Sequence, residues 1–433
     1  MTHRLIRIAA CAAVAILAGG SGSTPPSSTG PHPQLPAPDT GILPSLHFAT
    51  HETWPKGRTP QAPKGFTVTR YASLVHPRWI YVLPNGDVLV AQSSTIKTPP
   101  QSMEDRIHYF LERHTNVIVD SPNRITLLRD SNHDGIVDRT TTFLSGGLDR
   151  PFGMLLLNGN FYVADTGSVR VYPYRDGETQ ITAKGRKILD LPVGGYNNHW
   201  TRNLLARADG KKIYVTVGSG SNAGEYGMEN DKGRANILEI NPDGTGKRIY
   251  AAGIRNPNGL AYEPQSGQLW TVSNERDFLG DDLVPDFLTR VRDGDFYGWP
   301  WSYWGKHLDA RVKPQRPDMV AKAKAPDYAL GAHVAALGLA FYTADMFPAP
   351  YRGGAFIGEH GSWNRSPYVG YKVVYVPFKN AMPSGPPQDF LTGFLPRDGT
   401  AYGRPVGVVV APDGALLVAD DTGNSIWRVA VKK

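Results

Sequence analysis

The amino-acid sequence predicts an all-β protein folded as a six-bladed β-propeller, and three observations lead to this fold class. Glycine and proline are frequent, with 47 and 36 residues among 433, whereas charged residues make up only 20% of the chain. Aromatic residues contribute 10%, which is enough for a large core. A turn-rich and aromatic composition favours short strands over helical bundles. The third observation is a hairpin pattern that recurs along the chain.

The recurring hairpin consists of an apolar stretch, a tight turn and a strand rich in β-branched residues. Several of the turns contain Asn-Gly or Asp-Gly, which supply the positive φ that two-residue hairpins require. The copies begin at Pro77, Pro151, Asn203, Pro257, Leu337 and Pro405, and the fifth contains an insertion. Their mean spacing of about 66 residues leaves room for four strands per copy, as in a propeller blade. A β-sandwich is the alternative that the pattern leaves open.

The ring is expected to close between distant parts of the chain. Too few residues follow the copy at Pro405 to complete a blade, and the segment GFTVTRYA at 65–72 would supply the missing strand. The stretch MEDRIHYFLERH at 103–114 has apolar residues at helical spacing and predicts a helix outside the sheets.

Three regions are predicted along the chain. Residues 1–20 have the basic start, the apolar run and the small residues of a secretory signal peptide. Residues 21–62 are rich in Pro, Ser, Thr and Gly, which predicts a flexible or polyproline linker. Residues 63–433 would form the propeller. The expected location is the periplasm, with peripheral attachment to the outer face of the cytoplasmic membrane.

The composition excludes several kinds of chemistry. Cys11 is the only cysteine, so the mature protein would lack disulfides, thiol nucleophiles and Cys-ligated metals. A lipid acceptor role for Cys11 is the alternative for the segment IAAC. The net charge of +7 is scattered, and its densest cluster, KGRK at 184–187, has no interleaved aromatics, so nucleic-acid binding is not expected. The sequence lacks the P-loop, GxSxG and HExxH motifs and a dinucleotide-binding loop.

Polar residues that flank the repeats are candidate functional residues, because ligands commonly bind at one end of a propeller channel. His199, in the loop GGYNNHWTRNL, has the pKa range of a general base. Arg255 and Asn256 precede the fourth repeat, and arginine pairs naturally with a carboxylate. A structural role in a loop is the alternative for these residues. Three basic residues follow later in the chain: His360, Arg365 and Arg404.

Two segments are candidate calcium sites, because carboxylates and backbone carbonyls suit Ca²⁺. The segment DSNHDGIVD at 130–138 matches the start of an EF-hand-like loop, with Gly135 at the sharp turn. Its predicted ligands are Asp130, Asn132, Asp134, the carbonyl of Ile136, and Asp138. A plain β-turn is the alternative. The segment SNERDFLGDDLVPDFL at 273–288 clusters four carboxylates, for which a solvated acidic loop is the alternative: Glu275, Asp277, Asp281 and Asp282.

Several of these segments together resemble a known family. The stretches NNHWTRNL, GSGSNAGEYGMEN, GIRNPNGLAY, NERDFLGDDLVPD, DGDFYGWPWSYWG, LGAHVAALGLAFY, GEHGSWNRSPYVGYKVVYVPF and GRPVGV occur in order. They resemble the PQQ-dependent soluble aldose dehydrogenases, and more closely their L-sorbosone dehydrogenase branch. The resemblance extends from about residue 63 to residue 433 and implies a six-bladed propeller.

The resemblance also implies roles for individual residues. His199 resembles the catalytic base of the family. Arg255 and Asn256 resemble the pair that holds PQQ, and Arg404 resembles an arginine that binds a PQQ carboxylate. With Arg365, these arginines would form a ring of positive charge around the tricarboxylate cofactor.

The NERD turn resembles the segment that binds the catalytic Ca²⁺, here through the carbonyls of Arg276 and Asp277. The sequence departs from the soluble glucose-oxidising members in two places. Those members have an acidic residue near the position of Ser219 and a lysine near 360–365, and neither is present here.

The expected function is therefore that of a PQQ- and Ca²⁺-dependent oxidoreductase. It would oxidise an aldose or a sugar aldehyde, L-sorbosone-like, to the acid or lactone by hydride transfer to PQQ. A quinone or cytochrome-type electron acceptor is the expected partner. Two alternatives remain open, a calcium-dependent propeller lactonase or hydrolase and a non-catalytic propeller binding module.

Overall fold

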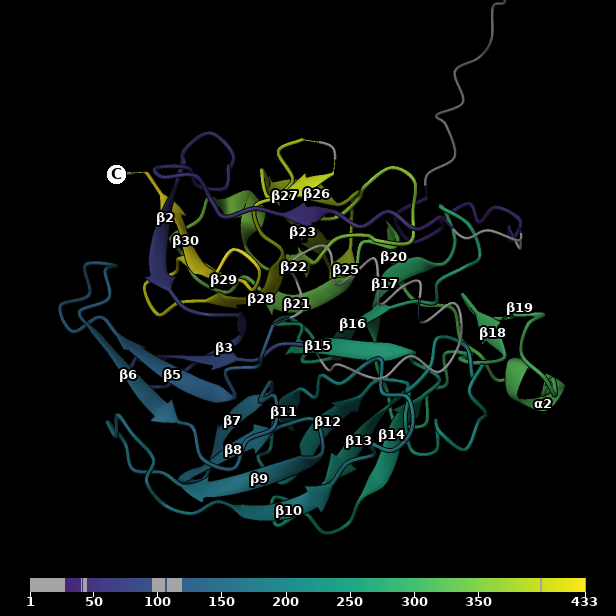
Figure 1. Ribbon diagram of the computed structural model, residues 1–433, viewed down its shortest axis with the longest axis horizontal. Coiled ribbons are helices and arrows are strands. Elements are labelled where there is room, and N and C mark those ends of the chain that lie inside the picture. Colours follow the sequence, from purple (N-terminus) through teal and green to yellow (C-terminus); the bar gives the residue numbers. More distant parts are fainter. Residues whose placement is uncertain are drawn as a thin grey trace, which may run out of the picture.

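The computed structural model describes residues 28–39, 41, 45–95, 106, 119–397 and 399–432. It contains six four-stranded antiparallel sheets arranged around a common centre (Figure 1). The prediction of an all-β, six-bladed propeller is confirmed. The predicted signal peptide, and all of the predicted helix at 103–114 except one residue, lie outside the described residues.

The blades follow one another in chain order, and each predicted repeat forms the first two strands of one blade. Blade 1 comprises β3 (Pro77–Val82), β4 (Val88–Gln92), β5 (Arg124–Arg129) and β6 (Arg139–Leu144). Blade 2 comprises β7 (Met154–Leu157), β8 (Asn160–Ala164), β9 (Ser168–Pro173) and β10 (Arg186–Asp190). Blade 3 comprises β11 (Leu204–Ala206), β12 (Ile213–Val217), β13 (Asn236–Ile240) and β14 (Arg248–Ala252). Blade 4 comprises β15 (Asn256–Tyr262), β16 (Leu269–Asn274), β17 (Pro285–Arg290) and β20 (Tyr328–Ala332). Blade 5 comprises β21 (Ala336–Phe341), β22 (Ala355–Glu359), β23 (Lys372–Val376) and β26 (Gln388–Leu391). Blade 6 comprises β28 (Pro405–Val410), β29 (Leu416–Asp420), β30 (Ser425–Val431) and β2 (Phe66–Ser73).

The ring closes as the sequence predicted. Strand β2, from the start of the propeller, pairs antiparallel with β30, the last strand of the chain, and Thr69 lies opposite Arg428. The outer edge of blade 6 is thus completed by a strand from more than 350 residues earlier. This arrangement joins both ends of the propeller in one sheet and leaves no unfinished blade.

The innermost strands of neighbouring blades approach closely because four of the repeats carry glycine at the contact, as two of them illustrate. A Cβ atom at Gly338 of β21 would lie 2.3 Å from the carbonyl oxygen of Val406 in β28. At Gly153, just before β7, it would lie 2.7 Å from the carbonyl oxygen of Arg202. The absence of a side chain therefore sets how tightly the blades gather around the centre.

Apolar and aromatic side chains fill the spaces between adjacent sheets. One cluster joins blades 1 and 2 through Trp79, Phe152 and Phe161, all buried. Another joins blades 5 and 6 around Phe356 and Trp427, which are fully buried. Each interface buries aromatic rings from both sheets, so the core is a set of wedges between blades rather than one central mass.

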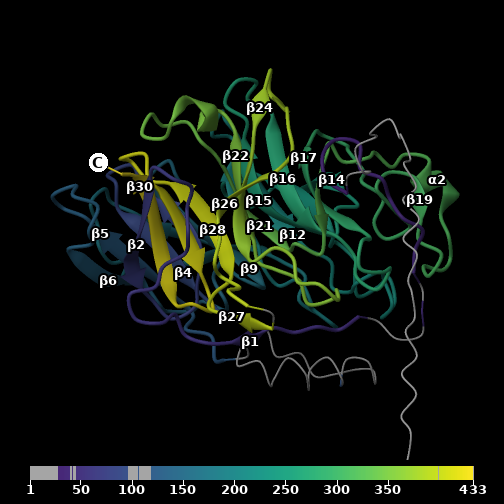
Figure 2. The ribbon, with the colours of Figure 1, turned by 90° about the horizontal axis from the view of Figure 1, so that it is seen from above.

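The segment predicted to be a flexible linker differs from that prediction where it is described. Its strand β1 (Thr50–His51) pairs in parallel with β27 (Thr400–Ala401), along one face of the propeller (Figure 2). The Trp54 side chain is only 8% exposed, and its Nε1 donates to Asp420 Oδ2 over 2.8 Å. Composition indicated little to bury, but a single tryptophan with a buried carboxylate partner anchors this part of the chain.

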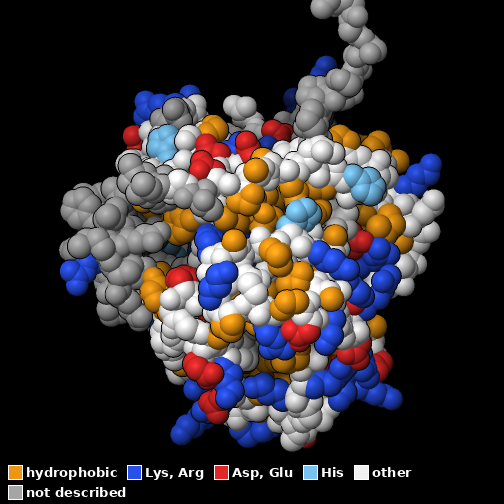
Figure 3. Space-filling view, turned by 90° about the vertical axis from the view of Figure 1, so that its right-hand side faces the viewer, with side chains coloured by type: hydrophobic (Ala, Val, Ile, Leu, Met, Phe, Trp, Pro, Cys, Tyr) orange, Lys and Arg blue, Asp and Glu red, His pale blue; other side chains and the backbone are white. Residues whose placement is uncertain are grey.

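A larger excursion separates the third and fourth strands of blade 4. It contains the hairpin β18 (Ser302–Tyr303) and β19 (His307–Leu308) and the short helix α2 (Pro317–Val320). On the side of the molecule where this excursion lies, acidic and basic side chains are intermingled (Figure 3). Within the described residues, no helix has the length and apolar character needed to cross a membrane.

Candidate functional site

The predicted site residues gather because of where they lie in each blade. The first strand of a blade is antiparallel to the second, so the start of one adjoins the end of the other. In blade 4, Asn256 pairs with Asn274, and in blade 6, Pro405 pairs with Asp420. Residues just before the first strand and just after the second therefore share one end of the propeller.

The first cluster at this end is centred on Arg255, which is 2% exposed. Its Nη2 lies 2.9 Å from Asp277 Oδ2 and donates to Asn222 Oδ1 over 2.9 Å, while Nη1 donates to the carbonyl of Glu275 over 2.6 Å. These partners hold the guanidinium from several sides, so its position is set by the fold.

The carboxylate of Asp277 is shared between this arginine and a histidine. Its Oδ1 lies 3.4 Å from His333 Nδ1. Burial alone would raise the pKa of Asp277, but the charge of Arg255 and the interaction with His333 hold it below the usual value. Burial would lower the pKa of His333, but its hydrogen bond to Asp277 raises it above the usual value. The three groups form one buried charged network.

His199 lies beside this network in a half-buried position. Its Nδ1 is 2.9 Å from the hydroxyl and 3.0 Å from the carbonyl oxygen of Ser219. Burial, and then the positive charge of Arg255, hold the pKa of His199 well below its usual value. The ring is therefore neutral at neutral pH, which is the state that a general base requires.

Asn256, the residue after Arg255, presents a buried acceptor. Its Nδ2 donates to Asn274 Oδ1 over 2.8 Å, while its own Oδ1 has no hydrogen-bond partner among the described residues. A buried acceptor without a partner is costly, so this oxygen is a group that a bound ligand would satisfy.

A second cluster contains Arg404 and His360. Arg404 donates from Nε and Nη2 to the carbonyls of His360 and Gly361, over 2.9 and 2.8 Å. His360 Nε2 lies 2.9 Å from Asp421 Oδ2. Burial and the charge of Arg404 lower the pKa of His360 to about 4. This histidine is therefore neutral at physiological pH despite its acidic partner.

Arg78 belongs to the same cluster, and the sequence-based interpretation missed it. Its Nη1 lies 2.5 Å from Asp421 Oδ2, and its guanidinium lies 5.3 Å from the centre of the Trp200 ring. Because Trp200 follows His199 in the chain, Arg78 links the two clusters. No sequence motif singled it out, because Arg78 lies inside the first strand of its repeat, whereas Arg255 and Arg404 precede theirs.

The side chains of Arg276 and Arg365 pair with acidic residues, although the prediction for Arg276 concerned its backbone carbonyl. The side chain of Arg276 is fully buried and binds Glu275 and Asp309, each over 3.2 Å. Arg365 contacts the acidic loop, with Nη2 2.9 Å from Asp282 Oδ1 and Nη1 donating to the carbonyl of Asp281. Arg365 thus ties two loops together, and its predicted contact with a cofactor stays a prediction.

The carbonyl of Asp277, a predicted calcium ligand, already accepts two hydrogen bonds. Asn222 Nδ2 donates to it over 3.1 Å and Arg311 Nη1 over 2.9 Å, and the same Arg311 nitrogen also donates to the carbonyl of Phe278. A cationic guanidinium therefore lies where a calcium ion would have to bind. Among the described residues, no three Asp, Glu, His or Cys side chains form a group that could hold a metal ion.

In the loop at 130–138, carboxylates accept hydrogen bonds from the backbone of the loop itself. Gly135 N donates to Asp130 Oδ2 over 2.8 Å, and Ser131 N donates to Asp138 Oδ2 over 2.6 Å. These bonds are typical of a tight turn stabilised by aspartate side chains. The loop joins the two outer strands β5 and β6 of blade 1, at the end opposite the site. Calcium binding here remains a prediction.

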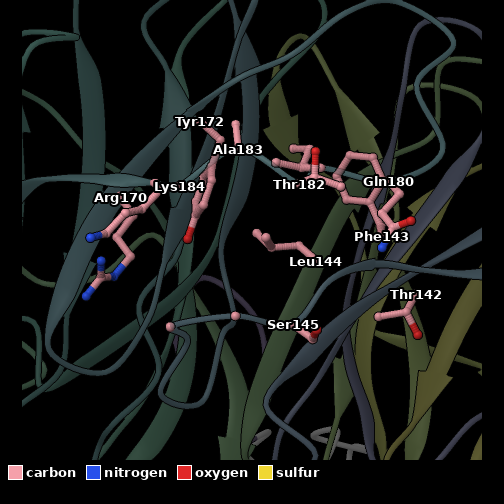
Figure 4. A pocket seen from close by; sticks show the side chains of 14 residues that line it. Thr142, Phe143, Leu144, Ser145, Arg170, Tyr172, Gln180, Thr182, Ala183 and Lys184 are labelled. Carbon is pink, nitrogen blue, oxygen red and sulfur yellow. The ribbon is translucent and has the colours of Figure 1, made fainter.

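A cavity of about 340 Å³ lies elsewhere, between β6 of blade 1 and the segment that leads into β10 of blade 2. Leu144 lies within the ring of lining side chains, with Arg170 and Lys184 together on one side (Figure 4). None of the predicted site residues lines it.

The fold and the site together define a class of protein, a propeller with arginines and a neutral histidine converging at one end. Residues 168–362 match the glucose/sorbosone dehydrogenase family, and residues 313–432 match a TrAA12-like family. The matched family agrees with the resemblance to PQQ-dependent sugar dehydrogenases that the motifs indicated.

Relatives with curated names match different parts of the chain. An uncharacterized protein of Borreliella burgdorferi is 29% identical over 354 residues, covering 79% of this chain and 92% of that protein. The aldose sugar dehydrogenase YliI of Escherichia coli is 29% identical over 165 residues, covering 38% of this chain and 40% of that protein. The pyrroloquinoline quinone-dependent pyranose dehydrogenase of Coprinopsis cinerea is 25% identical over 342 residues, covering 63% of this chain and 45% of that protein.

Solved structures share the fold at lower identity. A calcium structure of a Trichoderma reesei family AA12 enzyme superposes with a TM-score of 0.69 at 19% identity, covering 91% of this chain and 100% of that chain. The holo form of the PQQ domain of the Coprinopsis cinerea pyranose dehydrogenase gives a TM-score of 0.67 at 20% identity, covering 89% of this chain and 100% of that chain. At such identity these likenesses establish the fold alone.

Proposed function

We propose that the protein is a PQQ-dependent dehydrogenase that oxidises an aldose or a sugar aldehyde, L-sorbosone-like, to the lactone or acid. The family domain and the names of its relatives support a sugar dehydrogenase. One observation carries the proposal. A neutral histidine, His199, lies at the same end of the propeller as the arginine–aspartate pairs Arg255–Asp277 and Arg78–Asp421.

The residues present fit a tricarboxylate such as PQQ. Arg78, Arg255 and Arg404 contribute three positive charges, and Asp277 and Asp421 remove two, so these five side chains leave a net positive charge. Arg78 Nε and Asn256 Oδ1 are buried without hydrogen-bond partners among the described residues. Arg78, Arg255 and Arg404 would hold the carboxylates, and Asn256 would face a donor of the ligand.

When bound, PQQ supplies a quinone that accepts the hydride from the substrate carbon. His199 takes the proton of the substrate hydroxyl at its unprotonated ring nitrogen, so the hydroxyl carbon becomes a carbonyl as the hydride leaves. Arg255 has two roles. It would bind a carboxylate of the cofactor, and its charge, together with burial, keeps the His199 ring neutral. Asn222 and Asp277 hold Arg255 in place for both roles.

Calcium is proposed as the second cofactor because a related fold has been solved as a calcium structure. The predicted ligand carbonyl of Asp277 does not fit this role as arranged, because Arg311 donates to it. Binding of an ion there requires the Arg311 side chain to move, and no step of the reaction is assigned to the ion.

We also propose a periplasmic location, with peripheral attachment to the outer face of the cytoplasmic membrane. The predicted signal peptide at 1–20 supports the location. A quinone or cytochrome-type acceptor is the proposed partner, because a reduced cofactor must pass its electrons on before the next turnover.

The test is reconstitution of the purified protein with PQQ, with and without Ca²⁺, followed by dye reduction across a panel of aldoses and osones. We expect activity with PQQ and none with NAD⁺, because the sequence has no dinucleotide-binding loop. Lactone hydrolysis without dye reduction would instead support the hydrolase alternative. Dye reduction with NAD⁺ in the absence of PQQ would overturn the proposal.

A further inference from the structure

The hydrogen bonds around His199 determine which of its ring nitrogens carries the proton. Nδ1 faces two oxygens of one residue, the hydroxyl and the carbonyl of Ser219, at 2.9 and 3.0 Å. The carbonyl can only accept a hydrogen bond. The hydroxyl could in principle donate or accept, so the direction depends on where its own proton goes.

The hydroxyl proton of Ser219 is already committed. Its Oγ lies 2.6 Å from the carbonyl oxygen of Ser221, which can only accept. The hydroxyl therefore donates to Ser221 and offers only a lone pair to His199. Both oxygens that face Nδ1 are acceptors, so Nδ1 carries the proton and Nε2 carries the lone pair.

The turn that contains Ser219 is held in place by neighbouring elements. Asp231 accepts from Gly220 N over 2.5 Å and also from the hydroxyl of Ser221. Ser219 N donates to the carbonyl of Arg255 over 2.7 Å, which ties the turn to the first cluster. A Cβ atom at Gly218 would lie 2.5 Å from His199 Cβ, so the ring packs directly on the turn. Ser219 cannot move away from the ring without breaking these contacts.

We propose that Ser219 is the positioning residue for His199, and that it fixes the neutral Nδ1–H tautomer so that Nε2 is the atom that accepts the substrate proton. A carboxylate at this position would also accept from Nδ1 but would stabilise the charged imidazolium. Serine orients the ring without adding a negative charge. The tautomer is a property of the protein alone, and only the role of Nε2 rests on the proposed function.

The tautomer is tested by ¹⁵N NMR of the histidine-labelled protein without cofactor. We expect His199 to show a protonated Nδ1 and an unprotonated Nε2 at neutral pH. In Ser219→Ala the carbonyl remains but the hydroxyl acceptor is lost, so part of the population should change to the Nε2–H form, and Ser219→Thr should restore the parental spectrum. An Nε2–H ring in the parent protein would overturn the proposal.

Kinetics of the PQQ-loaded enzyme provide the second measurement. Ser219→Ala should lower kcat by about 5- to 10-fold, the effect of one hydrogen bond, with KM nearly unchanged. The matched control is Ser168→Ala, which removes a buried hydroxyl bonded to Asp165 in blade 2 and should leave the His199 spectrum and kcat unchanged. A folded Ser219→Ala variant with parental spectrum and kcat would also overturn the proposal. Failure of PQQ to support activity would contradict the proposed function and leave the NMR result to decide the tautomer.

Discussion

Arg78 and Asp421 form a buried ion pair that joins the first blade to the last at the functional end of the propeller. Their side chains meet over 2.5 Å, and the Asp421 carboxylate also contacts His360 from blade 5. Burial would raise the pKa of Asp421, but His360 and Arg78 hold it far below its usual value. The ion pair therefore holds blade 1 against blade 6, and it also contributes charged groups to the candidate site.

Replacement of Arg78 tests this double role. Arg78→Gln leaves the buried Asp421 without its cationic partner, and removing one member of a buried pair typically costs about 3–5 kcal/mol. We expect a lower melting temperature and at least 10-fold weaker PQQ binding, measured by calorimetry and by fluorescence titration. Arg316→Gln, which breaks an exposed pair with Asp318, is the control and should change neither quantity appreciably. Parental PQQ affinity in a folded Arg78→Gln variant would exclude Arg78 from the cofactor site.

Removal of the His199 side chain tests its role as the base. His199→Ala should lower kcat by on the order of 10²- to 10⁴-fold, the usual contribution of a positioned general base. PQQ affinity should stay within a few-fold, because the cofactor is expected to rest on the arginines. The exposed His307 supplies a control, and His307→Ala should behave as the parent. A folded, PQQ-loaded His199→Ala variant with parental turnover would show that the histidine is a structural loop residue.

Stability should depend on pH through Glu359, a buried residue at the end of β22. Burial raises the pKa of Glu359 to about 8. The folded state therefore keeps the Glu359 proton up to that pH, whereas the unfolded state loses it near 4.5, the usual pKa of a glutamate. Protonated Glu359 therefore adds to the free energy of unfolding. This contribution is fully present below the pKa that the residue has in the unfolded state, and it is lost as the pH rises through about 8.

The variant Glu359→Gln keeps the shape of the side chain and cannot ionise. Its melting temperature should exceed that of the parent at pH 8.5 by about 2 °C or more, and the difference should shrink towards pH 5. Glu52→Gln, at an exposed position paired with Arg397, serves as the control. Parallel melting curves of Glu359→Gln and the parent from pH 5 to 9 would contradict the assignment.

The loop at 130–138 gives a test that separates a calcium site from a turn. Asp130 accepts from the backbone nitrogens of Asp134 and Gly135, so Asp130→Ala should lower the melting temperature even without calcium. If the loop also binds Ca²⁺, the ion should raise the melting temperature of the parent but not of the variant. Turnover should be unaffected, because the loop lies at the opposite end from His199. Equal shifts on adding Ca²⁺ to both proteins would show that the loop binds no calcium.

Sequence patterns predicted the fold well because they are local. Each hairpin turn and its two strands lie within 11 to 24 residues, so glycine-containing turns between β-branched strands mark the first half of each blade. The closing strand at 65–72 was also predicted, because the last repeat was visibly incomplete. The linker prediction was wrong at Trp54, because composition averages over a segment and does not register one residue whose indole meets a buried carboxylate.

The candidate site was predicted in part. His199, Arg255, Asn256 and Arg404 do lie at one end of the propeller, and the motifs around them had singled them out. Arg78 was missed, because a lone arginine in a strand has no local signal. Its importance comes from contacts with Asp421 and Trp200, which lie far away in the chain.

The sequence by itself determined the number of blades, the way in which the ring closes, and the family that its motifs resemble. These are consequences of turn chemistry and strand periodicity, which act over a few residues. The tertiary structure alone decided which charged groups share a partner. It placed Arg365 on the acidic loop, Arg311 on the carbonyl of Asp277, and the Ser219 oxygens on His199. Those partners lie between 20 and 84 residues apart in the chain, and their coupling depends on distance and burial, which only the packed propeller sets.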